Sequence, residues 1–263
     1  MNPLQTIITA SIAAGKEILK IYHTDFSIEY KEDESPLTMA DKNANEVIIS
    51  FLKDTGIPVL SEEGRSISYE ERKNWHQLWI VDPLDGTKEF IKRNDEFTVN
   101  IALVENHEPV MGVVYTPVLD ILYVGEKSLG SFKIERASKK ENLMNELNNN
   151  NRLPAINEKD YYGIVASRSH LNEETSQFIE EVKSSHINVK IVSKGSSLKL
   201  CMVAEGTADI YPRFAPTMEW DTAAGDAVVR ASEGIVLQAK TETPLVYNKE
   251  NLLNPWFIVK RKP

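Results

Sequence analysis

The sequence predicts a layered protein of mixed α/β class, and three observations support this fold class. The chain has 263 residues, which is long enough for one large domain or two modest ones around a buried core. Between residues 97 and 134, several β-rich runs separated by turn signals are typical of an antiparallel meander. In the second half, strand and helix patterns alternate, which favours helices packed on a sheet.

In the first half, apolar residues at helical spacing predict an amphipathic helix over residues 3–22. An alternating polar stretch at 27–31 predicts a short strand. Residues 37–41 lead into a second predicted helix, which carries Val47, Ile48, Phe51 and Leu52 and stops at Gly56. Short apolar runs predict buried strands at 57–60 and 78–81.

Residues 137–160 have mixed charge and include four consecutive asparagines, so we expect a linker or an exposed excursion there. Beyond it, the pattern predicts strands at 162–166, 189–192, 208–211, 235–237 and 256–259, and helices at 173–182, 198–205 and 222–232. We therefore expect an N-terminal α+β domain over residues 1–136 and a C-terminal α/β domain over residues 155–263.

The composition excludes several classes of protein. Hydrophobic residues make up 41% and charged residues 26%, which is ordinary for a globular protein and too apolar for a disordered one. The net charge of −9 argues against a nucleic-acid-binding surface, so an anionic ligand would need local basic side chains or cations. The single cysteine, Cys201, cannot form an intrachain disulfide, and its apolar neighbours predict a packing role.

No segment predicts secretion or membrane insertion. The N-terminus lacks the basic lead and continuous apolar core of a signal peptide. The longest apolar stretch, residues 110–124, is interrupted by Thr116, Pro117 and Asp120. We expect a cytoplasmic protein. Peripheral attachment to the inner face of a membrane stays open, although no basic amphipathic helix favours it.

Acidic side chains gather where the predicted strands end. Glu62 and Glu63 follow one buried strand. Asp82 and Asp85 follow the next, and Asp221 lies just before a predicted helix. Crowded carboxylates repel strongly at a low effective dielectric, and divalent cations such as Mg²⁺ or Mn²⁺ relieve that repulsion. The alternative is that each acid is a solvated loop residue or a helix cap, and for the glutamate pair alone this is the simpler interpretation.

The run Asp82-Pro83-Leu84-Asp85-Gly86-Thr87 predicts a turn that presents two carboxylates and a carbonyl to one point. Pro83 fixes φ and removes an N–H group, while Gly86 lets the backbone approach a ligand closely. Thr87 adds a hydroxyl that can hold a water molecule. A second run, Trp220 to Asp226, predicts Asp221 as the N-cap of a helix whose first N–H groups can receive a phosphate.

Together these elements resemble the signatures of the inositol monophosphatase superfamily of metal-dependent, lithium-sensitive phosphatases. The DPLDGT and WDTAAG runs are specific, whereas the glutamate pair is weak alone. The resemblance covers nearly the whole chain. It implies a layered αβαβα sandwich, of α+β / α/β class, of the inositol monophosphatase and fructose-1,6-bisphosphatase type.

Four further stretches resemble the bacterial 3′(2′),5′-bisphosphate nucleotidase branch of that superfamily: residues 88–91, 167–170, 195–199 and 211–220. The resemblance implies a small nucleotide as partner, removal of the 3′-phosphate of adenosine 3′,5′-bisphosphate to give AMP, and a place in sulfur metabolism. The 5′-phosphosulfate relative of that nucleotide is a further candidate substrate. The implied cofactor is Mg²⁺, in two or three copies, with Mn²⁺ as a substitute.

Carried over by position, the implied metal ligands are Glu62, Asp82, the Leu84 carbonyl, Asp85 and Asp221. The first three hold one cation, and the last two hold a second together with Asp82, which bridges. Glu62 also helps to place a third cation through water. Two such cations stabilise the attacking and leaving oxygens of an in-line displacement.

The implied catalytic residues are Asp41, Glu62 and Thr87. Thr87 orients the attacking water, and Asp41 polarises the Thr87 hydroxyl. The alternative role for Asp41 is a plain helix cap. A covalent phosphoaspartate is not expected, because the Asp-x-x-Asp spacing differs from the motif that supplies such a nucleophile.

The implied substrate-binding residues are Gly86, Thr87, His170, Ser196, Lys199, Arg213 and Asp221. Ser196 and Lys199, three positions apart at a helix start, can face one anion, and Arg213 can fork onto a second phosphate. His170 resembles a residue near the base or ribose. The alternatives are a structural role for His170 and surface positions for the two cations.

Two other functions remain open at this level. One is hydrolysis of inositol monophosphate or a sugar bisphosphate by the same metal site. The other is a non-catalytic sensor of metal and nucleotide, which the water-orienting pair argues against. The sequence leaves open whether the protein is a monomer or a homodimer.

Overall fold

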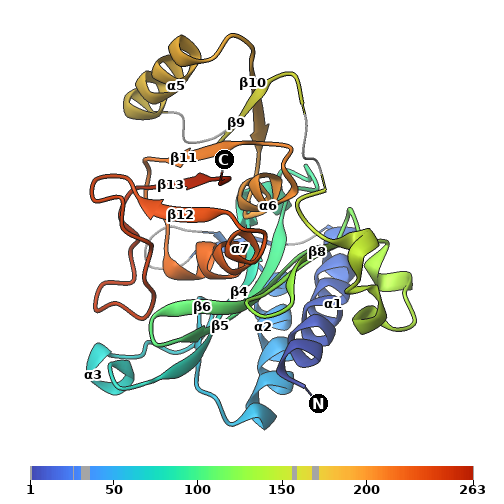
Figure 1. Cartoon of the computed structure of the whole chain (residues 1–263). Helices are drawn as coiled ribbons and strands as arrows, with labels where there is room; N and C mark the ends of the chain where they lie inside the picture. The colour runs from blue at the N-terminus through green and yellow to red at the C-terminus, as the bar shows by residue number, and fades with distance from the viewer. Residues whose placement is uncertain (1, 26, 31–35, 156–158, 168–171, 263) are drawn as a thin grey trace.

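The structure is a computed structural model that describes residues 2–25, 27–30, 36–155, 159–167 and 172–262. In this part of the chain, helices and sheets alternate in layers from the N-terminal helix pair to the outermost helix (Figure 1). The predicted αβαβα sandwich is confirmed. The two larger sheets lie on either side of a central pair of helices.

The first layer is a helix pair, α1 (Pro3–Tyr22) and α2 (Met39–Leu52), packed on one face of the larger sheet. Helix α1 has the predicted bounds. Asn2 caps it by accepting a hydrogen bond from the Leu4 N–H at 2.9 Å, and Pro3 occupies its first turn, where no N–H partner is needed.

The larger sheet has six strands and confirms the predicted meander. Its spatial order follows the chain order: β3 (Val59–Ser61), β4 (Gln77–Asp85), β5 (Thr98–Glu105), β6 (Glu108–Thr116), β7 (Ile121–Glu126) and β8 (Gly130–Glu135). Strands β3 and β4 are parallel, and all later neighbours are antiparallel. The carboxyl ends of β3 and β4 therefore meet at one edge of the sheet.

The central helices, α6 (Leu198–Glu205) and α7 (Glu219–Ala231), cover the opposite face of this sheet. Cys201 is buried in α6, as its apolar neighbours predict. Helix α7 crosses β6 and β7 at two glycines. A Cβ at Gly112 would lie 2.6 Å from the Ala224 oxygen, so the helix and sheet backbones are in direct contact there.

Replacing Gly125 with alanine is expected to destabilise the fold by about 1–3 kcal/mol, the usual range for overpacking. The added Cβ would lie 2.5 Å from the Val228 Cα in α7, and a backbone cannot rotate away as a side chain can. Urea denaturation followed by circular dichroism measures the loss. Lys127→Ala, at a nearby exposed residue, is the matched control; equal urea midpoints for the two variants would contradict the expectation.

The second sheet has the order β10 (Val189–Lys194), β9 (Tyr162–Ser167), β11 (Ile210–Arg213), β13 (Phe257–Lys260) and β12 (Ile235–Gln238). Its first three strands are parallel and its last two antiparallel to their neighbours. Helix α5 (Glu173–Ser185) forms the outer layer, where Ile179 packs with Ile164 and Ile210 in a small separate core. The strand–helix alternation predicted for this half is confirmed.

The remaining elements are short: β1 (Glu29–Tyr30), β2 (Pro36–Leu37), η1 (Lys53–Thr55), α3 (Tyr69–Arg72), α4 (Thr87–Ile91), η2 (Ala137–Lys139), η3 (Leu143–Glu146) and η4 (Asn149–Asn151). The three last lie in the segment predicted as a linker or excursion, and Leu143, Met144 and Leu147 pack against the first core. None of the helices in the described ranges combines the length and the apolar character needed to cross a bilayer.

Candidate metal and phosphate site

Two of the predicted ligands come together because their strands are parallel neighbours. Glu62 directly follows β3, and Asp82 lies in β4, which pairs with β3 in parallel register. The Glu62 N–H donates to the Val81 oxygen at 3.1 Å and holds this residue against β4 beyond the end of its own strand. Strand topology therefore places both carboxylates at the same sheet edge.

The predicted turn over the whole DPLDGT run is wrong, because Asp82 to Asp85 form the end of β4 and the chain leaves the strand only at Gly86. The pairing of β4 with β5 is irregular between Asp82 and Asp85, and Asp85 pairs again with Thr98, so a bulge interrupts the strand pairing there. Asp82 Oδ1 accepts a hydrogen bond from the Leu84 N–H at 3.0 Å. Gly86 follows with φ at +92°, a backbone conformation that favours glycine, and Thr87 begins α4.

Asp221 reaches the site from the other half, and its predicted place at the N-cap is wrong. Helix α7 begins at Glu219, with Met218 as N-cap, so Asp221 is the third helical residue. Its Oδ2 accepts a hydrogen bond from the Met218 N–H at 2.8 Å. The Asp221 carboxylate thus caps the helix from within its first turn. The N-cap residue, Met218, has an apolar side chain that makes no capping hydrogen bond of its own.

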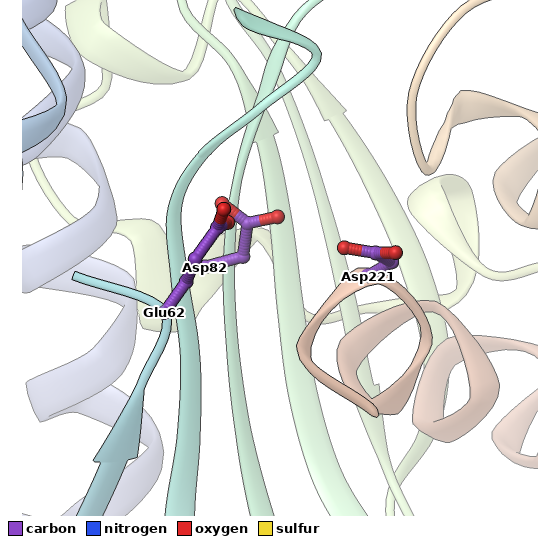
Figure 2. A group of neighbouring side chains, drawn as sticks. All are labelled: Glu62, Asp82 and Asp221. Carbon is purple, nitrogen blue, oxygen red and sulfur yellow. The ribbon is translucent and has the colours of Figure 1, made fainter. Parts of the chain in front are cut away.

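Figure 2 shows the carboxylates of Glu62 and Asp82 side by side, with Asp221 facing them from the start of α7. One carboxylate oxygen from each of the three residues lies within 4.8 Å of the others. Asp82 is 1% exposed, and its Oδ2 has no hydrogen-bond partner among the described residues. A buried carboxylate oxygen of this kind is strongly disfavoured unless a cation or a proton compensates it.

Burial and mutual repulsion shift the proton affinities of this cluster. Burial, followed by the charges of Glu62 and Asp85, raises the pKa of Asp82 well above its usual range. Burial, followed by the charge of Asp85, raises the pKa of Asp221 to about 8. For scale, two charges about 4 Å apart at an effective dielectric of about 20 repel by about 4 kcal/mol.

This donor set fits a hard divalent cation. Three carboxylates converge, one of them with a buried unpartnered oxygen, and their charges favour a ligand of the opposite sign. Asp85 is close enough for its charge to act on both Asp82 and Asp221, although it is not one of the three converging residues. The Leu84 carbonyl accepts a long contact, 3.4 Å, from the Thr87 hydroxyl.

Asp41 is not the N-cap of α2, which is Thr38, but it contacts both the start of that helix and the DPLDGT turn. It is the third residue of α2, and its Oδ2 accepts hydrogen bonds from the Thr38 N–H at 2.7 Å and the Thr38 hydroxyl at 2.6 Å. Its Oδ1 accepts from the Thr87 hydroxyl at 3.3 Å. One oxygen therefore caps the helix, and the other connects this buried acid to the DPLDGT turn.

The two predicted cations of the second half lie together and are nearly buried. Lys199 is 6% and Arg213 is 8% exposed, and neither forms an ion pair with a described residue. The Lys199 Nζ donates to the Ser196 oxygen at 2.5 Å, and Arg213 Nη2 donates to the Pro216 oxygen at 2.9 Å. Arg213 Nε has no hydrogen-bond partner among the residues that the structure describes. Burial lowers the pKa of Lys199 to about 8.

Ser196 is placed differently from the prediction that it faces the same anion as Lys199. Its Oγ lies 2.7 Å from Asp85 Oδ2 and 2.5 Å from Thr98 Oγ1, so its single proton can be donated to either, and it contacts a predicted metal ligand. His170 lies outside the described residues.

Three side chains that the motifs did not single out also contribute: Thr98, Asn100 and Ser197. Asn100 Nδ2 donates to Ser197 Oγ at 3.0 Å, and Ser197 donates through its N–H to Asp85 Oδ2 at 2.7 Å. The sequence does contain a pattern that indicates Thr98 and Asn100, because polar residues alternate with apolar ones where β5 begins.

Comparison with known proteins identifies the family of this chain and several similar sequences. The sequence profile described as the inositol monophosphatase family matches residues 2–257. The 3′(2′),5′-bisphosphate nucleotidase CysQ of Salmonella typhimurium is 42% identical over 260 residues, which covers 97% of this chain and 98% of the relative. The nucleotidase CysQ of Escherichia coli K12 is 41% identical over 251 residues, covering 94% of each chain.

Solved structures of proteins from the same family are also similar to this chain. The crystal structure of CysQ from Bacteroides thetaiotaomicron, a bacterial member of the inositol monophosphatase family, has a TM-score of 0.91 and 52% sequence identity. The match covers 99% of this chain and 97% of that one. An inositol monophosphatase from Thermotoga maritima has a TM-score of 0.75 at 22% identity, with 99% and 92% covered, and so shares the fold.

Proposed function

Because the chain belongs to the inositol monophosphatase family, we propose that it is a 3′(2′),5′-bisphosphate nucleotidase that converts adenosine 3′,5′-bisphosphate to AMP and phosphate. The observation that carries the proposal is the buried Asp82 oxygen, unpartnered and faced by Glu62 and Asp221, in a chain so similar to the CysQ nucleotidases. A phosphatase of small anions needs cations where the phosphate binds, and the acidic cluster provides their ligands.

We propose Mg²⁺ as the cation. Glu62, Asp82 and the Leu84 carbonyl would hold one ion, and Asp85 and Asp221 would hold a second together with Asp82. The bound ions supply charge neutralisation for the phosphate and lower the pKa of water. The all-oxygen donor set supports this choice, because hard oxygen ligands prefer Mg²⁺ over softer metals.

The protein's own groups orient the attacking water. The Thr87 hydroxyl lies within reach of two acceptors, Asp41 Oδ1 at 3.3 Å and the Leu84 oxygen at 3.4 Å. When Thr87 donates to Asp41, its oxygen lone pairs are free to accept a hydrogen bond from water. Asp41 is 2% exposed and anchored by Thr38, so this acceptor for the Thr87 hydroxyl is in place before substrate binds.

Lys199 and Arg213 would bind the phosphate that is not cleaved. Both are nearly buried, neither forms an ion pair with a described residue, and Arg213 Nε has no hydrogen-bond partner among those residues. Lys199 has two Nζ protons beyond the one given to Ser196. A dianionic phosphate satisfies these donors, which supports a bisphosphate over a monophosphate as substrate.

Release of inorganic phosphate from adenosine 3′,5′-bisphosphate, measured with Mg²⁺ and with EDTA, tests the function. We expect multiple turnovers with Mg²⁺ and none with EDTA. Inositol 1-phosphate and the 5′-phosphosulfate relative serve as comparison substrates. Failure to release phosphate from the bisphosphate, or a higher kcat/KM with inositol phosphate, would overturn the proposal.

Lys199→Ala is expected to lower kcat/KM for adenosine 3′,5′-bisphosphate by about 10- to 100-fold. This follows from the loss of a charged hydrogen bond worth about 1.5–3 kcal/mol. With 3′-AMP, which lacks the second phosphate, the loss should be much smaller. Lys190→Ala, an exposed lysine of β10, is the matched control. Equal losses with both substrates would place Lys199 away from the second phosphate.

A further inference from the structure

Polar side chains stand at alternate positions where the apolar strand β5 begins. Glu96, Thr98 and Asn100 are two residues apart, so they share one face of this segment. Phe97 and Val99 point to the other face, into the core beneath α1 and α2. Thr98 and Asn100 are fully buried, and buried polar groups require polar partners.

The first partner is the backbone at Gly195, in the segment 195–197 between β10 and α6. Glu96 Oε2 accepts a hydrogen bond from the Gly195 N–H at 2.8 Å, and its Oε1 accepts from Lys194 Nζ at 3.1 Å. A Cβ at position 195 would lie 3.0 Å from the Glu96 carbonyl oxygen. Glycine therefore permits the close approach of the two halves at this point.

The next two residues of the segment meet the next two polar side chains. Thr98 Oγ1 lies 2.5 Å from Ser196 Oγ and donates to Asn100 Oδ1 at 2.9 Å. This second contact orients the Asn100 amide, so that its Nδ2 donates to Ser197 Oγ at 3.0 Å. Three consecutive residues of the segment 195–197 thus contact three alternate residues, 96, 98 and 100, at the start of β5.

Ser197 lies between two of the proposed metal ligands. Its Oγ is 2.9 Å from Asp85 Oδ2 and 2.7 Å from the Asp221 carbonyl oxygen, so its single proton can be donated to either. Its backbone N–H also donates to Asp85 Oδ2, at 2.7 Å. These contacts occupy one oxygen of Asp85 and leave Oδ1 for a cation.

We infer that Ser197, held by Asn100 and Thr98, is a positioning residue that sets Asp85 and Asp221 in the arrangement that binds a cation. The inference rests on the proposed function, because it concerns the same metal site. Asp85 is the last residue of β4 and Asp221 belongs to α7, so no local turn can fix one relative to the other. Hydrogen bonds to metal ligands commonly raise metal affinity by about 10- to 100-fold.

Ser197→Ala tests the inference, because it removes the hydroxyl and keeps the backbone N–H. We expect the dissociation constant for Mn²⁺, measured by calorimetry and electron paramagnetic resonance on the whole protein, to rise by about tenfold or more. The KM for nucleotide at saturating Mg²⁺ should stay unchanged. Ser193→Ala, at an exposed serine of the neighbouring strand β10, is the matched control and should bind Mn²⁺ like the wild type.

Thr98→Val provides a second variant of equal shape that loses the hydroxyl orienting Asn100. It should weaken Mn²⁺ binding in the same direction, and Thr98→Ser should restore it. Wild-type affinity in both Ser197→Ala and Thr98→Val would overturn the inference while leaving the phosphatase in place. Absence of divalent cation binding by the wild type would instead overturn the proposed function. If circular dichroism shows that Ser197→Ala does not fold, the Mn²⁺ affinities of Thr98→Val and Thr98→Ser decide between the outcomes.

Discussion

Asp82→Asn is expected to abolish phosphatase turnover and, at the same time, to raise the melting temperature of the metal-free protein. The loss of turnover should exceed about 100-fold, since removal of a mere partner of a metal ligand already costs up to that factor. The stability gain has a separate cause. An asparagine cannot ionise, so folding no longer requires a proton to be held at this buried position, and its Nδ2 offers a donor to Glu62 and Asp221.

Differential scanning fluorimetry in EDTA measures the second effect. A rise of about 2–4 °C is expected for each kcal/mol of repulsion relieved in a chain of this size. Asp54→Asn, the same chemical change at an exposed residue of η1, should alter neither activity nor melting temperature. A variant that melts below the wild type in EDTA, or that keeps its turnover, would contradict the role given to this carboxylate.

Raising the pH from 5.5 to 8.5 is expected to destabilise the metal-free protein while strengthening its binding of Mg²⁺. Folding raises the pKa of Asp82 and raises that of Asp221 to about 8, both above the values in the unfolded chain. The folded state thus holds protons that the unfolded state has released. This contribution to stability is fully present below the unfolded pKa near 4 and is lost as the pH rises through the folded value.

Mg²⁺ must displace those same protons, so its affinity should rise by up to about tenfold per pH unit for each proton released. Melting curves with EDTA and with Mg²⁺ at several pH values measure both trends. Asp82→Asn should show a flatter pH dependence in EDTA than the wild type. The charged groups that act on this cluster include Asp41, Glu62, Asp85 and Arg213. A pH-independent gain in melting temperature from Mg²⁺ would contradict the proton linkage.

Local signals in the sequence were sufficient for most elements and for the metal-side residues. The 3.6-residue period of residues 3–22 specifies α1, because one apolar stripe is buried against the sheet. The Asp82–Thr87 run could be assigned because Pro83 fixes φ at its position and Gly86 permits the positive φ with which the strand ends. Both signals act within a few neighbouring residues, which is why they can be read without a partner segment.

The remaining features depend on contacts between distant segments. The start of α7 could not be located from sequence, because its N-cap is Met218, whose side chain gives no capping signal. The contact between Asn100 and Ser197 joins residues 97 positions apart, and no local periodicity encodes such a pairing. The alternation at the start of β5 predicts a buried polar face, but the identity of its partners emerges only from the packing of the two halves.

The glycine contacts between α7 and the larger sheet have a consequence for motion during the catalytic cycle. Because backbone rests on backbone at Gly112 and Gly125, no compressible side chain separates the helix from its support. Sliding or tilting of α7 would require steric overlap, so Asp221 keeps a constant place from one turnover to the next. Any movement that accompanies entry of nucleotide or departure of product is therefore expected outside this pair of backbone contacts.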